Sequence, residues 1–288
     1  MKSFPFVLGF FLASAFWSAA QVSLELVLDQ EQFLLNESLP VKVRIINRSG
    51  QTLQLGQDKD WLTFTIESKE GSLVAPIGEV PVTGEQSIDS SMVANRSVDL
   101  MPYYDLSKPG RYRVTAAIRI KPLKEQFISK PKNFEISAGT KIWEQEFGVG
   151  TTEGNSPEVR KYTLQQANYV KQLTLYVRVT DSTEQRVFKV LPVGPLLSFS
   201  RPEARIDRTS NLHLLFQTGA RSFLYQVINP DGDLLLRQTH DYANARPVLR
   251  TGEDGKTFIS GGVRRITPKD IPPPVTSAST NDAKTSKP

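Results

Sequence analysis

Hydrophobic and polar residues alternate in a series of short runs between residues 21 and 138. A period of two is the pattern of a β-strand with one buried face and one face in water. Turn-forming clusters such as Asn47–Gly50 and Lys108–Gly110 separate the runs. Six or seven such strands in about 115 residues predict an antiparallel sandwich rather than a parallel sheet. The main runs lie at Leu24–Leu28, Val41–Ile45, Leu62–Ile66, Ser97–Met101, Tyr112–Ile120 and Asn133–Ile136.

A Pro-Gly turn directly precedes Tyr112, which opens the longest alternating run. In Greek-key sandwiches such a tyrosine returns its hydroxyl to the backbone a few residues upstream and holds the corner between strands. The segment Leu106–Tyr112 resembles the corner of bacterial immunoglobulin-like domains, and Glu37–Gly50 is similar to their second strand. The resemblance covers residues 22–138 and implies an immunoglobulin-like sandwich domain at 21–138. The cysteine pair and core tryptophan of antibody domains are absent, and another kind of β-sandwich is the alternative.

Residues 139–267 carry further apolar runs that indicate strands. These runs lie at Leu173–Val179, Val187–Val190, Leu212–Phe216, Phe223–Val227 and Leu234–Leu236. Between the last two, Asn229–Gly232 contains the proline and glycine of a tight hairpin turn. Only Glu158–Lys171 has a pattern that can be interpreted as a helix.

The second half also contains a repeat. The segment that starts at Arg201 and carries Arg205 returns 45 residues later with Arg246 and Arg250. Periods of 40 to 50 residues with several short strands are typical of propeller blades. Residues Ile206–Gly232 resemble blades of the sialidase-like and related propeller families. The predicted fold is therefore all-β, with the sandwich followed by a β-rich domain at 139–267 that contains propeller-blade-like repeats.

The length of this second domain limits how it can close. About 130 residues at 45 residues per blade make fewer than three blades, whereas a closed propeller needs at least four. The segment is then an open fragment, a unit that closes by self-association, or a small sandwich with a superficial repeat. The last two together fit the length best.

Both ends of the chain lie outside the predicted domains. Lys2, the apolar run Phe4–Trp17 and the small residues Ser18–Ala20 have the pattern of a secretory signal peptide at 1–20, cleaved after Ala20. An uncleaved N-terminal membrane anchor is the alternative. After Thr267 the chain is rich in proline, serine, threonine and lysine, which predicts a disordered tail at 268–288.

The chain contains no cysteine among its 288 residues. This excludes disulfides, metal sites built on thiolates and a cysteine nucleophile. It also excludes a lipid attached to a cysteine after the signal peptide. Since secreted eukaryotic domains commonly use disulfides, export without cysteine indicates the bacterial periplasm or the extracellular space. No later run reaches the roughly 20 apolar residues that a membrane-spanning helix needs.

Basic residues concentrate in the second half. Residues 139–267 have 17 Lys and Arg against 13 Asp and Glu, and 12 of the 17 are arginine. The guanidinium group is a planar fork of donors that suits carboxylate, sulfate or phosphate. The repeat therefore predicts an anion-binding rim. The candidate ligand-binding residues are Arg201, Arg205, Arg246 and Arg250. The alternative is that the arginines near the repeat are ordinary solvated residues that pair with Glu203, Asp207 and Asp254.

Signals of catalysis are sparse. The two histidines are His213 and His240, and none of the common motifs for a catalytic serine, zinc, a phosphate loop or a dinucleotide is present. Alternation points His213 away from Leu212, which places it on the strand surface or against satisfying partners. We expect no enzyme, no catalytic residue, no cofactor and no metal. Nucleic-acid binding is not expected either, because no recognition motif occurs.

These observations predict an exported noncatalytic binding protein that engages an anionic glycan, an envelope component or a protein partner through its basic second domain. Two alternatives stay open. One is a structural component of an exported oligomeric assembly. The other is a glycan-acting hydrolase that uses carboxylates among Glu203, Asp207, Asp231 and Asp241.

Overall fold

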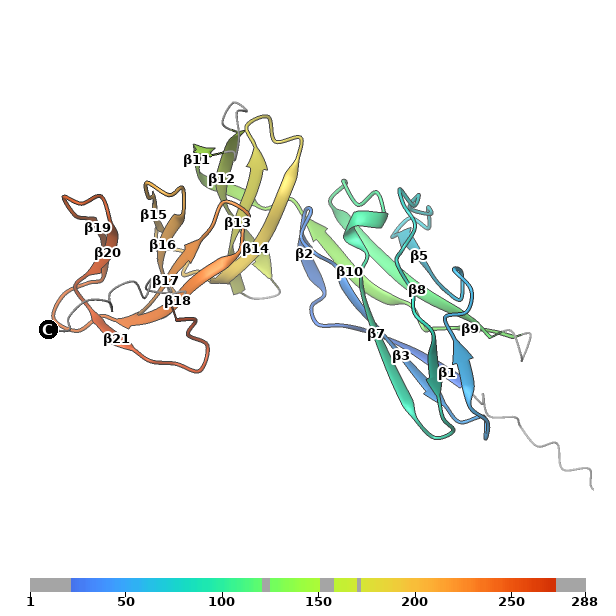
Figure 1. Cartoon of the computed structure of the whole chain (residues 1–288). Helices are drawn as coiled ribbons and strands as arrows, with labels where there is room; N and C mark the ends of the chain where they lie inside the picture. The colour runs from blue at the N-terminus through green and yellow to red at the C-terminus, as the bar shows by residue number, and fades with distance from the viewer. Residues whose placement is uncertain (1–21, 121–124, 151–157, 170–171, 273–288) are drawn as a thin grey trace, which may run out of the picture.

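The computed structural model describes residues 22–120, 125–150, 158–169 and 172–272. The described chain is built from strands, apart from one three-residue 3-10 helix at Met101–Tyr103. This confirms the all-β class. None of the helical segments in the described part of the chain has the length and apolarity to cross a bilayer. Figure 1 shows two lobes, the first made of β1 to β10 and the second of β11 to β21. The predicted signal peptide at 1–20 lies outside the described residues.

The first lobe contains two main sheets. One has the order β1-β3-β7, and the other has the order β2-β10-β8-β5 with β9 paired to β8. All neighbouring strands are antiparallel except β10 and β2. A separate pair is formed by β4 and β6. The bounds are β1 Val22–Leu28, β2 Gln32–Leu34, β3 Pro40–Asn47, β4 Leu53–Leu55, β5 Leu62–Ser68, β6 Gln86–Ile88, β7 Val93–Asp99, β8 Gly110–Ile120, β9 Glu125–Ile128 and β10 Lys132–Ser137.

The alternating pattern explains how these sheets pack. In β3, Val41, Val43 and Ile45 are buried while Lys42 and Arg44 are exposed. Buried side chains from both sheets form one hydrophobic core, which fits the predicted β-sandwich.

One strand lies earlier than the alternation predicts. The expected strand at Ser97–Met101 is instead Val93–Asp99. Oδ1 of Asp99 accepts a hydrogen bond from the Met101 backbone nitrogen at 3.0 Å, and Pro102 follows. The strand ends there because this turn begins the 3-10 helix and proline has no backbone donor for a ladder.

Tyr112 makes the predicted corner contact. Its hydroxyl donates to the backbone oxygen of Lys108 at 2.6 Å, and its ring stacks on Phe134 with 5.6 Å between centroids. The bond fixes the turn that leads into β8. This confirms the sequence-based expectation for the hydroxyl.

We expect Tyr112→Phe to lower the free energy of unfolding by about 1 kcal/mol. The change removes the bond to Lys108 and keeps the stacked ring. Urea unfolding of the purified protein measures it. The control is Tyr103→Phe, because the Tyr103 hydroxyl has no hydrogen-bond partner among the described residues. Equal effects of the two substitutions would contradict the corner's role.

The second lobe contains two further antiparallel sheets and a hairpin. The sheets have the orders β11-β12-β13-β14 and β15-β16-β17-β18-β21, and β19 pairs with β20. The bounds are β11 Thr140–Val149, β12 Glu158–Tyr169, β13 Gln172–Asp181, β14 Val187–Pro195, β15 Glu203–Ile206, β16 Leu212–Gln217, β17 Ser222–Ile228, β18 Leu234–Asp241, β19 Val248–Thr251, β20 Thr257–Ser260 and β21 Val263–Arg265.

Two layers of apolar contacts hold this lobe together. One core lies between the two sheets and includes Tyr162, Val177 and Phe216. A smaller cluster lies on the opposite face of the β15–β18 sheet and joins Leu249 of the hairpin to side chains of that sheet, including Tyr225. Because both faces of β16 and β17 are covered, nearly all of their side chains are buried. Within the described residues the sheets do not close into a ring.

The helical interpretation of Glu158–Lys171 is wrong. The structure has the strand β12 there, between β11 and β13, and residues 170–171 lie outside the described residues. Tyr162 and Leu164 are fully buried, two residues apart on one face of the sheet. Pairing on both edges therefore outweighs the helical preference of residues such as Gln165 and Ala167.

Two short segments complete the lobe. The predicted hairpin turn at Asn229 joins β17 to β18, and Oδ1 of Asn229 accepts hydrogen bonds from the backbone nitrogens of Asp231 and Asp233. Beyond β21, Ile271 exchanges backbone hydrogen bonds with Arg237 at 3.0 and 3.1 Å. Residues 268–272, part of the predicted tail, thus return to β18, and residues 273–288 lie outside the described residues.

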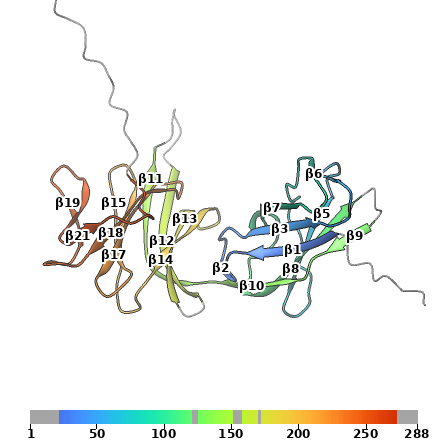
Figure 2. The ribbon, with the colours of Figure 1, turned by 90° about the horizontal axis from the view of Figure 1, so that it is seen from below.

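The lobes meet at a short junction. Two residues connect β10 to β11, and Figure 2 shows the chain passing directly between the lobes. Leu34 of the first lobe packs with Tyr176 and Val190 of the second. Nη1 of Arg178 donates to the Leu35 oxygen at 3.2 Å. Gly139 has a φ of +69°, and a Cβ there would lie 2.6 Å from Cδ1 of Leu34, so this position needs glycine.

Candidate functional site

The two copies of the repeat lie side by side in space. The Glu203 carboxylate accepts a hydrogen bond from the Leu249 backbone nitrogen at 2.9 Å. Nη1 of Arg205 donates to Oγ1 of Thr251 at 3.3 Å. Both contacts join residues 46 positions apart, so the copies run in the same direction. The sequence period thus corresponds to a real proximity between β15 and the hairpin β19–β20.

The two copies repeat every 45 residues in the sequence, but residues 46 positions apart are neighbours in space. Because of this one-residue shift, arginines at equivalent positions of the repeat are not neighbours. Residues alternate between the two faces of a strand, so Arg250 lies on the opposite face from Leu249 and Thr251. Leu249 faces the sheet and packs in its outer cluster, whereas Arg250 faces solvent. The guanidinium of Arg246 lies over the Phe223 ring, 5.3 Å from its centroid. The arginines of the two copies therefore do not occupy equivalent places: Arg205 contacts the hairpin, Arg246 lies over Phe223 and Arg250 projects from the solvent face of β19. Arg201 is exposed two residues before β15.

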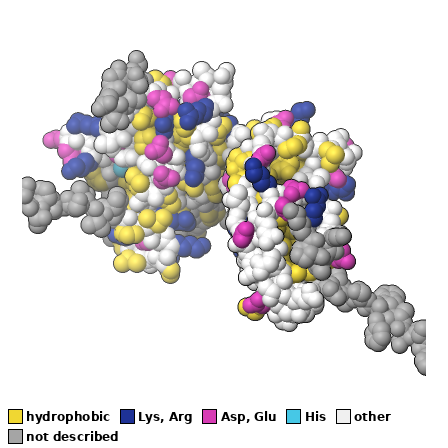
Figure 3. All heavy atoms as spheres, turned by 45° about the vertical axis from the view of Figure 1, so that its right-hand side comes forward, with side chains coloured by type: hydrophobic (Ala, Val, Ile, Leu, Met, Phe, Trp, Pro, Cys, Tyr) yellow, Lys and Arg dark blue, Asp and Glu magenta, His cyan; other side chains and the backbone are white. Residues whose placement is uncertain are grey.

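Arg208 joins this group, although it was not among the four predicted residues. Its guanidinium lies at the tip of the hairpin, where a Cβ on Gly255 would come within 2.5 Å of Nε. We call Arg201, Arg205, Arg208, Arg246 and Arg250 the arginine surface. All five side chains are exposed. On the face shown in Figure 3, Lys and Arg side chains form several patches separated by acidic and uncharged ones, so the basic character is local.

The carboxylates near the arginine surface have other partners. Glu203 binds the backbone of Leu249, and Asp254 binds the backbone nitrogen of Lys256 at 3.0 Å and its Nζ at 3.4 Å. Asp207 accepts hydrogen bonds within its own turn and from His213. No described carboxylate lies within 4.0 Å of a guanidinium nitrogen of the arginine surface. The alternative interpretation, in which these arginines pair with Glu203, Asp207 and Asp254, is therefore wrong for the described residues.

Two further arginines close to the second copy of the repeat, Arg264 and Arg265, do form ion pairs. Arg264 pairs with Asp270 at 3.6 Å, and Arg265 pairs with Asp241 at 2.7 Å. Within the described residues, the guanidinium groups near the repeat that have no ion pair are therefore those of the arginine surface.

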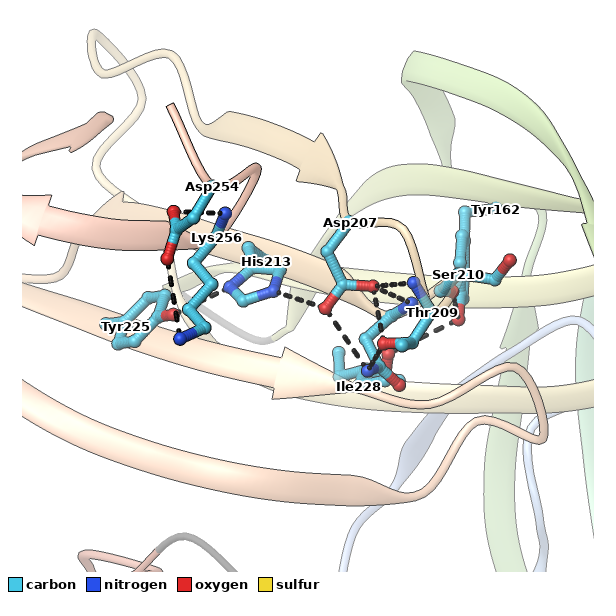
Figure 4. Close-up of polar contacts among 10 residues, drawn as sticks. Tyr162, Asp207, Thr209, Ser210, His213, Tyr225, Ile228, Asp254 and Lys256 are labelled. Carbon is cyan, nitrogen blue, oxygen red and sulfur yellow. Dashed lines mark hydrogen bonds and ion pairs between the residues drawn. The ribbon is translucent and has the colours of Figure 1, made fainter. Parts of the chain in front are cut away.

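Asp207 is the centre of a polar network beneath the hairpin (Figure 4). Its carboxylate accepts from the backbone nitrogens of Thr209 and Asn211 and from Nε2 of His213 at 3.0 Å. Nδ1 of His213 lies 2.7 Å from the Tyr225 hydroxyl. His213 is 7 % exposed, so of the two expectations for it, the satisfied histidine is correct and the strand-surface one is wrong.

The electrostatics of this network favour a structural role. Burial alone would raise the pKa of Asp207, but hydrogen bonds from His213, Asn211 and Thr209 outweigh it and lower the pKa to about 2. Burial and the charge of Asp207 raise the pKa of Tyr225 to about 12. The Tyr225 side chain is buried, so no substrate reaches its hydroxyl. The network fixes the turn that carries Arg208, one of the five residues of the arginine surface.

The sequence contains a sign of this network, which is the run of short polar side chains in the turn after Ile206. Asp207, Thr209 and Asn211 alternate in a short polar turn, and such side chains commonly bond their own backbone. The partner Tyr225 could not be identified, because it lies on the neighbouring strand and its register with His213 depends on the hairpin between them.

The carboxylates considered for hydrolysis are all engaged. Besides Glu203 and Asp207, Asp231 accepts from Nη1 of Arg160 at 2.8 Å, and Asp241 binds Arg265. Among the described residues, no three of His, Asp or Glu gather in a way that could hold a metal ion. No protein-family model and no curated protein sequence matches this chain.

Proposed function

We propose that this chain is an exported noncatalytic binding protein that engages an anionic partner through the arginine surface. The observation that carries the proposal is a set of five exposed guanidinium groups without ion pairs among the described residues, beside carboxylates that are bound elsewhere. An anion that docks there gains charge-assisted hydrogen bonds without first breaking internal ion pairs.

Two of these arginines are held in place before any ligand arrives. Arg205 donates a hydrogen bond to the Thr251 hydroxyl, and Arg246 lies over the ring of Phe223. Holding long side chains in position lowers the entropy lost on binding. This supports recognition by geometry more than by net charge.

In this proposal the first lobe is an immunoglobulin-like sandwich at 21–138, and the second, at 139–267, presents the arginine surface. The corner made by Tyr112 supports the first assignment. In the second lobe, β11 to β14 and β15 to β18 are each four strands in which every strand pairs with the next one along the chain. This arrangement supports blade-like repeats. The signal-peptide pattern at 1–20 supports export to the bacterial periplasm or the extracellular space.

Alanine at Arg201, Arg205, Arg246 and Arg250 should weaken binding of dextran sulfate about tenfold. Titration calorimetry on the purified protein measures this at low salt, where exposed charges act most strongly. Wild-type affinity should fall with rising salt, because the contacts are ionic.

The matched control has alanine at four exposed arginines of the first lobe, each of which is paired with a carboxylate. These are Arg44, Arg111, Arg113 and Arg119. Both variants lose four positive charges. The control variant should bind dextran sulfate with an affinity within about twofold of the wild type. Equal losses in the two variants would show that overall charge, and not the arginine surface, governs binding.

A further inference from the structure

An exposed phenylalanine lies beside the arginine surface on the hairpin. Phe258 and Arg250 are directly opposite each other in β19–β20, so both project from the solvent face. Phe258 is 48 % exposed, and its ring lies close to Gly252, where an added Cβ would be 3.7 Å from Cε1. One side of the ring thus covers the hairpin turn while the other side is open.

A second exposed phenylalanine, Phe199, lies just before the first copy of the repeat. Phe199 is 78 % exposed and precedes Arg201 by two residues, within a turn in which the Ser200 nitrogen donates to the Leu197 oxygen. Among the phenylalanines that the structure describes, Phe199 and Phe258 are the two that are more than about a third exposed. Phe199 directly precedes the arginines of the first copy, and Phe258 follows those of the second.

The local charge is modest in spite of the arginines. Residues 199–208 and 246–258 contain six basic and four acidic side chains. A ligand that binds through dense charge alone gains little from such a surface, because Glu253 and Asp254 repel it. A chain of sugar acids has separated carboxylates for the guanidinium forks and apolar ring faces for the phenyl rings.

We infer that the partner of the arginine surface is an acidic polysaccharide, with its carboxylates on Arg201 and Arg250 and its ring faces on Phe199 and Phe258. This inference rests on the proposed function and names the chemical class of the ligand. A polyphosphate has no apolar ring faces, so it gains nothing from the exposed phenyl rings.

The test compares polygalacturonate with inorganic polyphosphate by titration calorimetry on the purified protein. Phe199→Ala with Phe258→Ala should weaken polygalacturonate binding about tenfold and change polyphosphate binding less than twofold. The control is Leu73→Ala with Ile77→Ala, two residues of the first lobe that are 70 % and 65 % exposed. All these side chains lie on the surface, and an unchanged melting temperature verifies folding.

Three results would overturn the inference. The first is unchanged polygalacturonate binding by the phenylalanine variant, and the second is an equal loss for both polymers. The third is tighter binding of oligo(dT) than of polygalacturonate, which would assign the rings to stacked bases. The proposed function fails separately, when alanine at the four arginines leaves dextran sulfate binding unchanged.

Discussion

Asp207→Ala is expected to lower the free energy of unfolding by about 3 kcal/mol at neutral pH. The substitution leaves the backbone donors of Thr209 and Asn211 and the ring of His213 without their acceptor. His213 is buried, so water replaces the lost contact poorly. Urea unfolding measures the loss, and Asp254→Ala at the exposed hairpin tip should change stability by less than about 0.5 kcal/mol.

The same carboxylate makes stability depend on pH in a defined window. Its pKa is about 2 in the folded chain, below the ordinary value of 3.8. A lowered folded pKa contributes stability that is complete above pH 4 and disappears as the pH falls toward 2. Asp207→Asn should remove this part of the acid dependence. If wild type and Asp207→Asn lose stability in parallel over that range, the carboxylate is not its source.

Tyr162→Ala should have the largest effect, about 4 kcal/mol. Tyr162 is fully buried between the two sheets of the second lobe, and its ring stacks on Phe147 with centroids 4.2 Å apart. Its hydroxyl proton is shared between the backbone oxygens of Ser210 and Ile228, which lie 3.0 and 3.3 Å from the hydroxyl oxygen. The alanine variant loses the packing and both contacts between the sheets.

A second substitution separates these contributions. Tyr162→Phe keeps the ring and removes the hydroxyl, so we expect a loss of about 1 to 2 kcal/mol. Thermal and urea unfolding of both variants provide the comparison. Equal losses for alanine and phenylalanine would mean that the hydroxyl contacts, and not the packing, hold the sheets together.

Alternation predicted strands well where one face of a sheet is buried and the other is in water. Val41, Val43 and Ile45 in β3 are such a case. The same rule missed β11, which is an edge strand with mostly exposed side chains and little apolar contrast. It also could not foresee that β16 and β17 are buried on both faces, because the hairpin that covers them begins only at Val248, beyond β18 in the sequence.

The candidate site was predictable only in part, because the sequence repeat indicates which segments are related but not which face each side chain occupies. Repetition in the sequence drew attention to Arg205 and Arg250, and their segments do lie together. The face on which each arginine points depends on a one-residue shift between the copies, which only the folded register fixes. In the alternative interpretation Asp207 pairs with an arginine, but in the structure its carboxylate is bound by its own turn and by His213.

The junction between the lobes has a mechanical consequence. A flexible tether would let each lobe tumble on its own, whereas two connecting residues, the packing of Leu34 on Tyr176 and the Arg178 contact restrain rotation. The hairpin with the arginine surface lies at the end of the molecule opposite the first lobe (Figure 1). If the first lobe is held fixed, the hairpin therefore stays at a nearly constant distance and orientation from it.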